Sequence, residues 1–174
     1  MHVHSFDPIV DSTSRVLVLG SMPGRASLLA GEYYAHPRNL FWPLMEDLLG
    51  VEREQRYARR AAALLARGVA LWDVLETCTR GSSLDSDIVE SSIVANDLPG
   101  LLERHPSIRT LCFNGLRAAN AFRRHVQPKL AAPDMLALHV LPSTSPANAS
   151  IPYPRKREAW RVVARSAQAV RPWR

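Results

Sequence analysis

The sequence predicts an α/β fold, a three-layer α/β/α sandwich built on a central, mainly parallel four-stranded sheet. Short apolar runs that end in turn residues alternate along the chain with longer, helix-forming segments. This alternation favours parallel strands that are covered by helices on both faces. The chain has 174 residues, the size of one compact domain, so we expect residues 1–174 to form a single domain.

Four apolar runs are the predicted strands, at residues 15–19, 69–72, 110–113 and 135–141. The first run ends at Gly20, the third at the turn pair Asn114-Gly115, and the last at Pro142. Each run is continuous rather than alternating, which is typical of strands buried on both faces of a sheet.

Helices are predicted over residues 41–50, 52–67, 93–104 and 116–125, and from Pro154 to about residue 170. The first has Pro43 in its opening turn, where proline is tolerated, and Gly50 as its stop. The second is rich in Ala, Leu and Arg, which are strong helix formers. The third is interrupted near Pro99.

The composition excludes several classes of protein. Hydrophobic residues make up 47% of the chain and charged residues 22%, which are ordinary globular values. No apolar run approaches the ~18 residues of a membrane span, and the first residues lack a signal-peptide core. Two cysteines, Cys78 and Cys112, are too few for a disulfide framework or a four-cysteine metal site. We therefore expect a cytoplasmic protein rather than a secreted or membrane protein.

Charge is distributed unevenly along the chain. The net charge is +6, but it is not spread evenly. Residues 1–87 contain 9 basic and 11 acidic residues, whereas residues 88–174 contain 13 basic and 5 acidic residues. In residues 150–174, seven basic residues accompany one acid, Glu158. This polarity is typical of a protein that binds a polyanion such as nucleic acid. The alternative is a solvated basic helix with no such partner.

The carboxyl ends of the predicted strands indicate where a ligand would bind, because open parallel sheets bind ligands in the crevice outside those ends. Four loops lie there, at residues 20–39, 73–87, 114–115 and 142–154. They hold three notable segments, Gly20-Ser-Met-Pro-Gly24, Ala35-His-Pro-Arg-Asn-Leu-Phe-Trp42 and Leu141-Pro-Ser-Thr-Ser-Pro-Ala-Asn148. The glycines and proline of the first segment fix a tight turn that directs backbone N–H groups toward a ligand. The phosphate loop and the hydrolase elbow G-x-S-x-G are both missing.

Together these segments resemble the two motifs of the uracil-DNA glycosylase superfamily. They are most similar to its hypoxanthine (deoxyinosine) DNA glycosylase branch, which is related to the mismatch-specific uracil glycosylases. The resemblance implies a uracil-DNA glycosylase-like fold and a base-excision repair enzyme. Such an enzyme hydrolyses the N-glycosidic bond of a deaminated base flipped out of double-stranded DNA. Hypoxanthine is the first expected base, and uracil or xanthine the second.

The enzyme would be monofunctional, because the motif loops contain no lysine that could form a Schiff base. We expect a monomer with no cofactor, and no metal, since no histidine pairs with cysteines or carboxylates at a metal-ligand spacing. One alternative is a uracil-preferring mismatch glycosylase of the same fold. Another, of a different class, is a DNA-binding module that lost catalysis.

Met22 departs from the motif of the mismatch-specific enzymes, in which an asparagine at this position holds the attacking water. A methionine cannot bind that water or accept a proton. The resemblance to the hypoxanthine branch implies that Asn39 is the catalytic residue instead, with its amide oxygen orienting the water. The alternative role for Asn39 is a turn or a helix N-cap just before Leu40-Phe41.

The resemblance also implies a base-binding pocket formed by Gly20, Ser21, Met22, Tyr34, Asp73 and Asn114. Tyr34 would stack under the flipped base, and Asp73 stands where uracil-specific members carry a base-reading asparagine. A carboxylate there would accept the N1–H of hypoxanthine and disfavour adenine, whose N1 is an acceptor. The alternatives are a helix N-cap at Asp73, ahead of residues 74–76, and a simple turn at Asn114.

DNA contacts are expected from the last loop and from the basic helix that follows it. The loop groups that would bind phosphates beside the flipped nucleotide are Ser143, Thr144, Ser145 and Asn148. At the start of the helix, further phosphates would be bound by Arg155, Lys156 and Arg157. The helical period places Trp160, Val163, Ala164 and Ala167 on the inward face.

Overall fold

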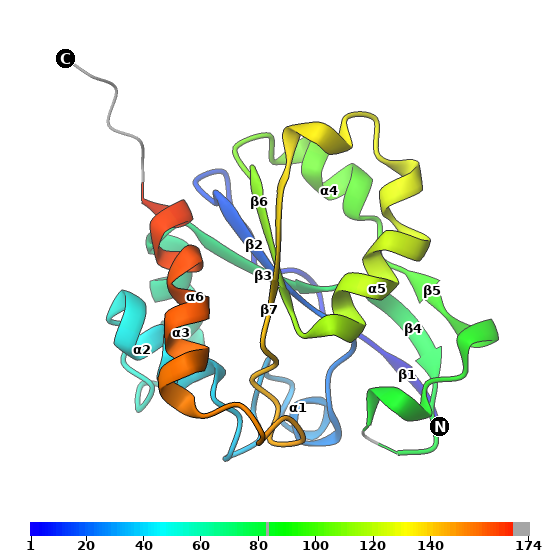
Figure 1. The fold of residues 1–174 in the computed structure, drawn as a ribbon, viewed down its shortest axis with the longest axis horizontal. Coiled ribbons are helices and arrows are strands. Elements are labelled where there is room, and N and C mark those ends of the chain that lie inside the picture. The colour runs from blue at the N-terminus through cyan, green and yellow to red at the C-terminus, as the bar shows by residue number, and fades with distance from the viewer. Residues whose placement is uncertain (83, 169–174) are drawn as a thin grey trace.

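The computed structural model describes residues 1–82 and 84–168, and its centre is a four-stranded parallel sheet (Figure 1). The strands, in their spatial order, are β3 (Val69–Asp73), β2 (Val16–Gly20), β6 (Thr110–Asn114) and β7 (Ala137–Leu141). Neighbouring strands are parallel throughout. The predicted strands are confirmed, with small shifts at their ends.

Helices cover both faces of this sheet, so the three-layer architecture is confirmed (Figure 1). One face carries α2 (Phe41–Leu49), α3 (Tyr57–Ala66) and α6 (Tyr153–Ala167). The other carries α4 (Leu98–Arg104) and α5 (Leu116–His125). The connections hold α1 (Arg25–Ala30), η1 (Asp85–Asp87), η2 (Glu90–Ser92), η3 (Gln127–Lys129) and η4 (Pro133–Met135). In the described part of the chain, none of the helices has the length and apolar character needed to cross a membrane.

The central strand β2 divides the core into two layers, because its alternate side chains point to opposite faces. Val18 packs in the cluster that contains Phe41 of α2 and Trp160 of α6. Leu19 packs in the cluster that contains Phe122 of α5. All of these side chains are fully buried.

A second sheet, which the sequence did not predict, lies beside the first. It is antiparallel and consists of β1 (His2–His4), β4 (Leu75–Thr79) and β5 (Val94–Ala95), in the order β1-β4-β5. Two of these strands are only three and two residues long, so they show no apolar run. Because β4 begins two residues after Asp73, no helix follows that residue, and the N-cap alternative for Asp73 was wrong.

Two predicted helices start later than expected. The helix predicted over residues 52–67 begins at Tyr57, and the one predicted over residues 93–104 begins at Leu98. In the second case Asp97 is the N-cap, and its side chain accepts the backbone N–H of Gly100 at 3.0 Å. Residues 94–95 pair with β4 instead of joining the helix, so pairing with the second sheet overrides their helix propensity.

Helix α6 packs much as the helical period predicts. Trp160, Val163 and Ala167 are buried, and Ala164 is half-buried. Lys156 is also buried on this face, at 1% exposure, which the pattern did not predict. The predicted end of the helix near residue 170 lies outside the described residues.

Candidate active site

A cavity of about 810 Å³ lies at the carboxyl ends of the parallel strands, and all four predicted loops contribute to its wall. Its lining includes the predicted residues Gly20, Ser21, Met22, Tyr34, Asn39, Asp73, Asn114, Ser143, Thr144, Ser145 and Asn148. Arg155, Lys156 and Arg157 lie outside this lining. The structure therefore brings together every predicted base-binding residue, although they come from distant parts of the sequence.

Asp73 and Gly20 form the floor of the cavity. They are neighbours across β3 and β2, and Asp73 is 3% exposed. A Cβ atom at position 20 would lie 2.5 Å from Oδ1 of Asp73 and 3.4 Å from the Tyr34 hydroxyl. The first distance is too short for any real contact, so only glycine allows this carboxyl group to lie against β2. The side chain of Asn96 fixes the backbone below, donating to the carbonyls of Asp73 at 2.9 Å and Leu75 at 3.1 Å.

Asp73 has an unusual charge state. Burial, and then the nearby carboxyl group of Asp85, raise its pKa to about 8, while the Arg80 guanidinium acts in the opposite direction. Its Oδ2 atom is buried and has no hydrogen-bond partner among the described residues. At neutral pH the side chain is therefore mostly a neutral acid, which differs from the ionised carboxylate expected from the sequence.

Tyr34 lines the cavity in a left-handed backbone conformation, with φ at 57°. Its ring stacks on Phe41, with centroids 4.1 Å apart and an interplanar angle of 26°. This contact covers one face of the ring. Burial and the proximity of Asp73 raise the pKa of the hydroxyl, so it stays protonated.

Asn39 combines a turn with a position on the cavity wall. Its Oδ1 atom accepts the backbone N–H of Phe41 at 3.0 Å, and its own N–H donates to the carbonyl of His36 at 2.8 Å. The turn alternative is therefore present in the structure. An amide oxygen has a second lone pair, and the amide nitrogen has two donors, so this turn leaves Asn39 capable of binding a water.

The last loop is held on three sides. The Asn114 amide donates to the Thr144 hydroxyl and accepts the Thr144 backbone N–H, both at 2.9 Å. The backbone N–H of Leu40 donates to the Thr144 carbonyl at 3.0 Å, which joins the loop to the segment that carries Asn39. Because Thr144 is fully buried, it positions the loop, and its prediction as a phosphate ligand was wrong. Ser143, Ser145 and Asn148 are partly exposed.

Lys156 provides the third support. Its ammonium group donates to the carbonyl of Ser143 at 2.8 Å and to that of Asn148 at 2.7 Å. Burial lowers its pKa, and the side chain is 1% exposed. The prediction that Lys156 contacts phosphate was therefore wrong, because the ammonium group of this lysine is bound to two carbonyl groups of the loop and joins the loop to α6. Trp160 of the same helix donates to the Pro142 carbonyl at 2.9 Å.

Comparison with known proteins agrees with this arrangement. Residues 8–165 match the profile of the uracil DNA glycosylase superfamily. The chain belongs to this superfamily. The resemblance stated from the motifs alone is thereby confirmed.

Two relatives of this superfamily member carry the name hypoxanthine DNA glycosylase. The protein from Methanosarcina acetivorans is 34% identical over 161 residues, which cover 92% of this chain and 96% of the relative. The protein from Methanosarcina barkeri is 32% identical over 119 residues, or 68% of this chain and 74% of the relative. A solution NMR structure of a candidate uracil DNA glycosylase from M. acetivorans superposes with a TM-score of 0.79. It is 31% identical in sequence, and the match covers 97% of this chain and all of that one.

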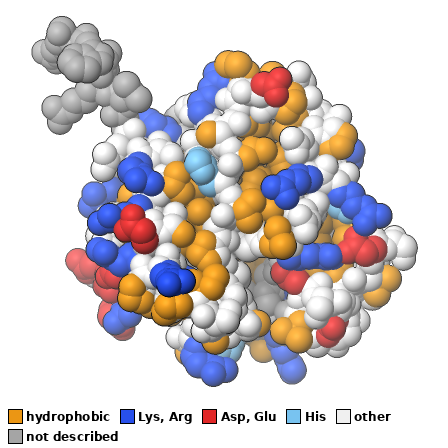
Figure 2. All heavy atoms as spheres, viewed as in Figure 1, with side chains coloured by type: hydrophobic (Ala, Val, Ile, Leu, Met, Phe, Trp, Pro, Cys, Tyr) orange, Lys and Arg blue, Asp and Glu red, His pale blue; other side chains and the backbone are white. Residues whose placement is uncertain are grey.

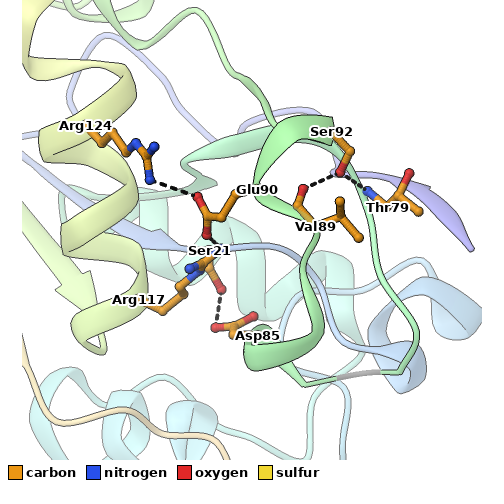
Figure 3. Close-up of polar contacts among 8 residues, drawn as sticks. All are labelled: Ser21, Thr79, Asp85, Val89, Glu90, Ser92, Arg117 and Arg124. Atoms are coloured by element: carbon orange, nitrogen blue, oxygen red, sulfur yellow. Dashed lines mark hydrogen bonds and ion pairs between the residues drawn. The ribbon is translucent and has the colours of Figure 1, made fainter.

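One residue that lines the glycosylase pocket and one that supports its wall were missed from the sequence. Asp85 of η1 accepts a hydrogen bond from the Ser21 hydroxyl at 2.6 Å and lines the cavity (Figure 3). Arg80, which is 1% exposed, donates to the Pro23 carbonyl in the first motif. Both lie in the predicted loop 73–87, but neither belongs to a recognisable motif, so no signal in the sequence could have singled them out.

Basic side chains lie at the rim of the cavity and on α6. Arg25 and Arg38 are exposed and line the cavity. On α6, Arg155 is exposed, and Arg157 pairs with Asp47 of α2 at 3.5 Å. Figure 2 shows Lys and Arg side chains gathered over α6 and along the edge of the molecule near α1. Positive charge therefore flanks the cavity on both sides.

The anchoring role of Lys156 is testable by removing its charge. Lys156→Met should lower the free energy of unfolding by about 1–3 kcal/mol, because two loop carbonyls lose their donor. Arg155→Met, which makes the same charge change on an exposed neighbour, is the control and should leave stability nearly unchanged. Chemical denaturation of both variants measures the difference. Equal stability of the two variants, with weaker DNA binding only for Lys156→Met, would return Lys156 to the set of phosphate ligands.

Proposed function

We propose that this chain is a monofunctional DNA glycosylase that hydrolyses the N-glycosidic bond of a deaminated base flipped out of double-stranded DNA. Hypoxanthine is the first substrate and uracil the second. The observation that carries the proposal is the cavity in which Asn39, Asp73 and the two motif loops meet. The names of the two archaeal relatives support the choice of hypoxanthine. We further propose that it acts as a monomer.

In the proposed reaction, the amide of Asn39 orients a water toward C1′ of the flipped nucleotide. The water oxygen bonds to C1′ as the bond between C1′ and the base breaks, and the bonding electrons leave with the base. Glycosidic bonds can break through a transition state with oxocarbenium character, which demands little of the nucleophile. An amide that is a poor base is therefore sufficient, and Met22 need not take part.

Neutral Asp73 supplies the leaving-group assistance. Its O–H donates to the carbonyl oxygen of the base, where negative charge develops, and the proton passes to the base as the base departs. The attacking water loses a proton to solvent, and Asp73 regains one from solvent after the product leaves. A burial-raised pKa near the working pH suits a group that must give up a proton and recover it.

Asp73 also defines which edge of a base the pocket accepts. A neutral carboxyl group offers one donor and one acceptor, which pair with adjacent C=O and N–H groups of hypoxanthine or uracil. The amidine edge of adenine pairs with the same acid, so Asp73 alone does not reject adenine. This changes the expectation drawn from an ionised carboxylate. Selectivity then comes from leaving-group stabilisation, because the neutral acid assists a base that can place negative charge on oxygen.

The DNA backbone is placed by groups around the cavity. The Ser143 and Ser145 hydroxyls and the Asn148 side chain lie on the loop beside the cavity, and Arg38 and Arg155 supply positive charge. These contacts would orient the duplex without reading its sequence.

Met22 favours the rival function, a DNA-binding module without catalysis, because it provides no oxygen for a water.

The catalytic role of Asn39 can be separated from its turn. Asn39→Ala should lower the single-turnover excision rate by roughly 10²-fold or more, with DNA binding little changed. Excision is measured as alkali-induced cleavage of duplexes containing inosine, uracil or xanthine. Asn39→Ser retains an oxygen acceptor for the Phe41 N–H but no amide, and it should be equally slow. A normal rate in Asn39→Ser would reduce Asn39 to a turn residue. Absence of cleavage by the wild-type protein on all three duplexes would favour the binding module.

The basic helix is testable through salt dependence. The double variant Arg155→Ala/Arg157→Ala should bind damaged and undamaged duplexes more weakly, and the slope of log K against log salt should shrink by about 0.9 for each phosphate that the variant no longer binds. The control is Arg123→Ala/Lys129→Ala, which removes the same charge from exposed positions outside the cavity lining. Fluorescence anisotropy at several salt concentrations gives both slopes. If the two double variants have equal slopes, α6 is a solvated surface.

A further inference from the structure

The cavity contains two carboxyl groups that differ in their surroundings. Asp73 is the last residue of β3, and Asp85 lies in η1, in the connection between β4 and β5. Both residues line the cavity. Asp85 accepts the Ser21 hydroxyl at 2.6 Å, and Ser21 is 8% exposed. Asp73 has a buried oxygen with no hydrogen-bond partner among the described residues. Asp85 thus has a hydrogen-bond donor that stabilises its ionised form, and the buried oxygen of Asp73 has none.

The charged side chains around the cavity affect the two carboxyl groups differently. Burial leaves the pKa of Asp85 raised overall, while the Ser21 hydrogen bond, Arg117 of α5 and Arg80 at the end of the second sheet act in the opposite direction and favour its ionised form. Glu90 pairs with Arg117 and with Arg124, at 3.4 Å for the latter, which fixes α5 against this wall (Figure 3). Arg124 pairs with Glu90 and its side chain is 69% exposed, so solvent and salt screen its charge. Of the two other cations, Arg117 pairs with Glu90, and Arg80 acts on both Asp85 and Asp73. Among the described residues of this cluster, no buried cation is therefore reserved for an ionised Asp73.

The other groups near Asp73 do not supply a counter-charge. Tyr33 and Tyr34 precede α2, and Tyr57 begins α3; an ionised Asp73 raises the pKa of all three hydroxyls. The Arg80 guanidinium acts on Asp73 in the opposite sense, and it is shared with Asp85. Two negative charges close together in a buried site raise the free energy of the folded protein. Ionisation of Asp85 therefore disfavours ionisation of Asp73.

We propose that Asp85 is a positioning residue of this site: it holds Ser21, next to Gly20, shares the Arg80 guanidinium with Asp73, and thereby presents Asp73 to the flipped base as a neutral acid. This inference rests on the proposed glycosylase function. It gives the second antiparallel sheet a part in the reaction, since that sheet leads directly into Arg80 and η1. Asp85 itself need not touch the reacting atoms.

The proposal predicts how excision depends on pH. The rate on an inosine duplex should fall at alkaline pH as Asp73 loses its proton. In Asp85→Asn the negative charge is gone, so Asp73 ionises more easily and the alkaline fall should move to lower pH by roughly one unit. The amide oxygen of the variant can still accept the Ser21 hydrogen bond.

Single-turnover rates measured from pH 5 to 10 test this prediction. Asp87→Asn is the matched control, because Asp87 lies in the same η1 helix but is exposed, binds Ser82 and is not part of the cavity wall. Its profile should coincide with wild type. Asp85→Glu, which keeps the charge, should restore the wild-type profile. Asp85→Gln serves as a second neutral variant if Asp85→Asn does not fold.

An Asp85→Asn profile lowered equally at every pH would make Asp85 merely structural and overturn the proposal. An alkaline fall that stays in place would overturn it as well, as would a wild-type rate that shows no alkaline fall. In all of these outcomes the wild-type protein still releases hypoxanthine. Failure of the wild-type protein to release any base would instead defeat the proposed function.

Discussion

The contact between the carboxyl group of Asp73 and the bare backbone of Gly20 is the constraint on which the site depends. It requires adjacent parallel strands in register, a glycine on one and an aspartate on the other. Once the carboxyl group lies there it is cut off from water, and its pKa rises to about 8. Burial, and then the nearby Asp73, also raise the pKa of the Tyr34 hydroxyl, which keeps it protonated. The way in which two strand ends pack therefore determines the protonation state of a carboxyl group in the cavity.

The rest of the structure serves to keep the surrounding loops in place. Asn114 and Leu40 both bind Thr144, so three loops from separate parts of the chain share one buried residue. Lys156 closes the last loop from the helix side, and Arg80 holds the first motif through Pro23. A glycosylase gains rate from groups fixed before the substrate arrives, because those groups need no reorganisation during the reaction. The anchoring residues contribute through that rigidity.

The sequence predicted the parallel sheet, most of its helices and the loops of the cavity, because continuous apolar runs and turn residues are local signals. The second sheet was missed because β1 and β5 are too short to show a pattern. Lys156 was assigned to the surface because lysines are seldom buried, and its two carbonyl partners lie on a loop that only the tertiary structure brings close. The raised pKa of Asp73 depends first on its burial and then on Asp85, 12 positions away in the sequence, so it could not be derived from either residue alone.

If Asp73 is a neutral acid in the folded protein, the titration of its own carboxyl group must show it. The carboxyl carbon of Asp73 can be followed by NMR in protein labelled with ¹³C at aspartate, and Asp73→Asn identifies its signal. We expect a single transition with a midpoint near pH 8. A midpoint near pH 4, as for an exposed aspartate, would contradict it.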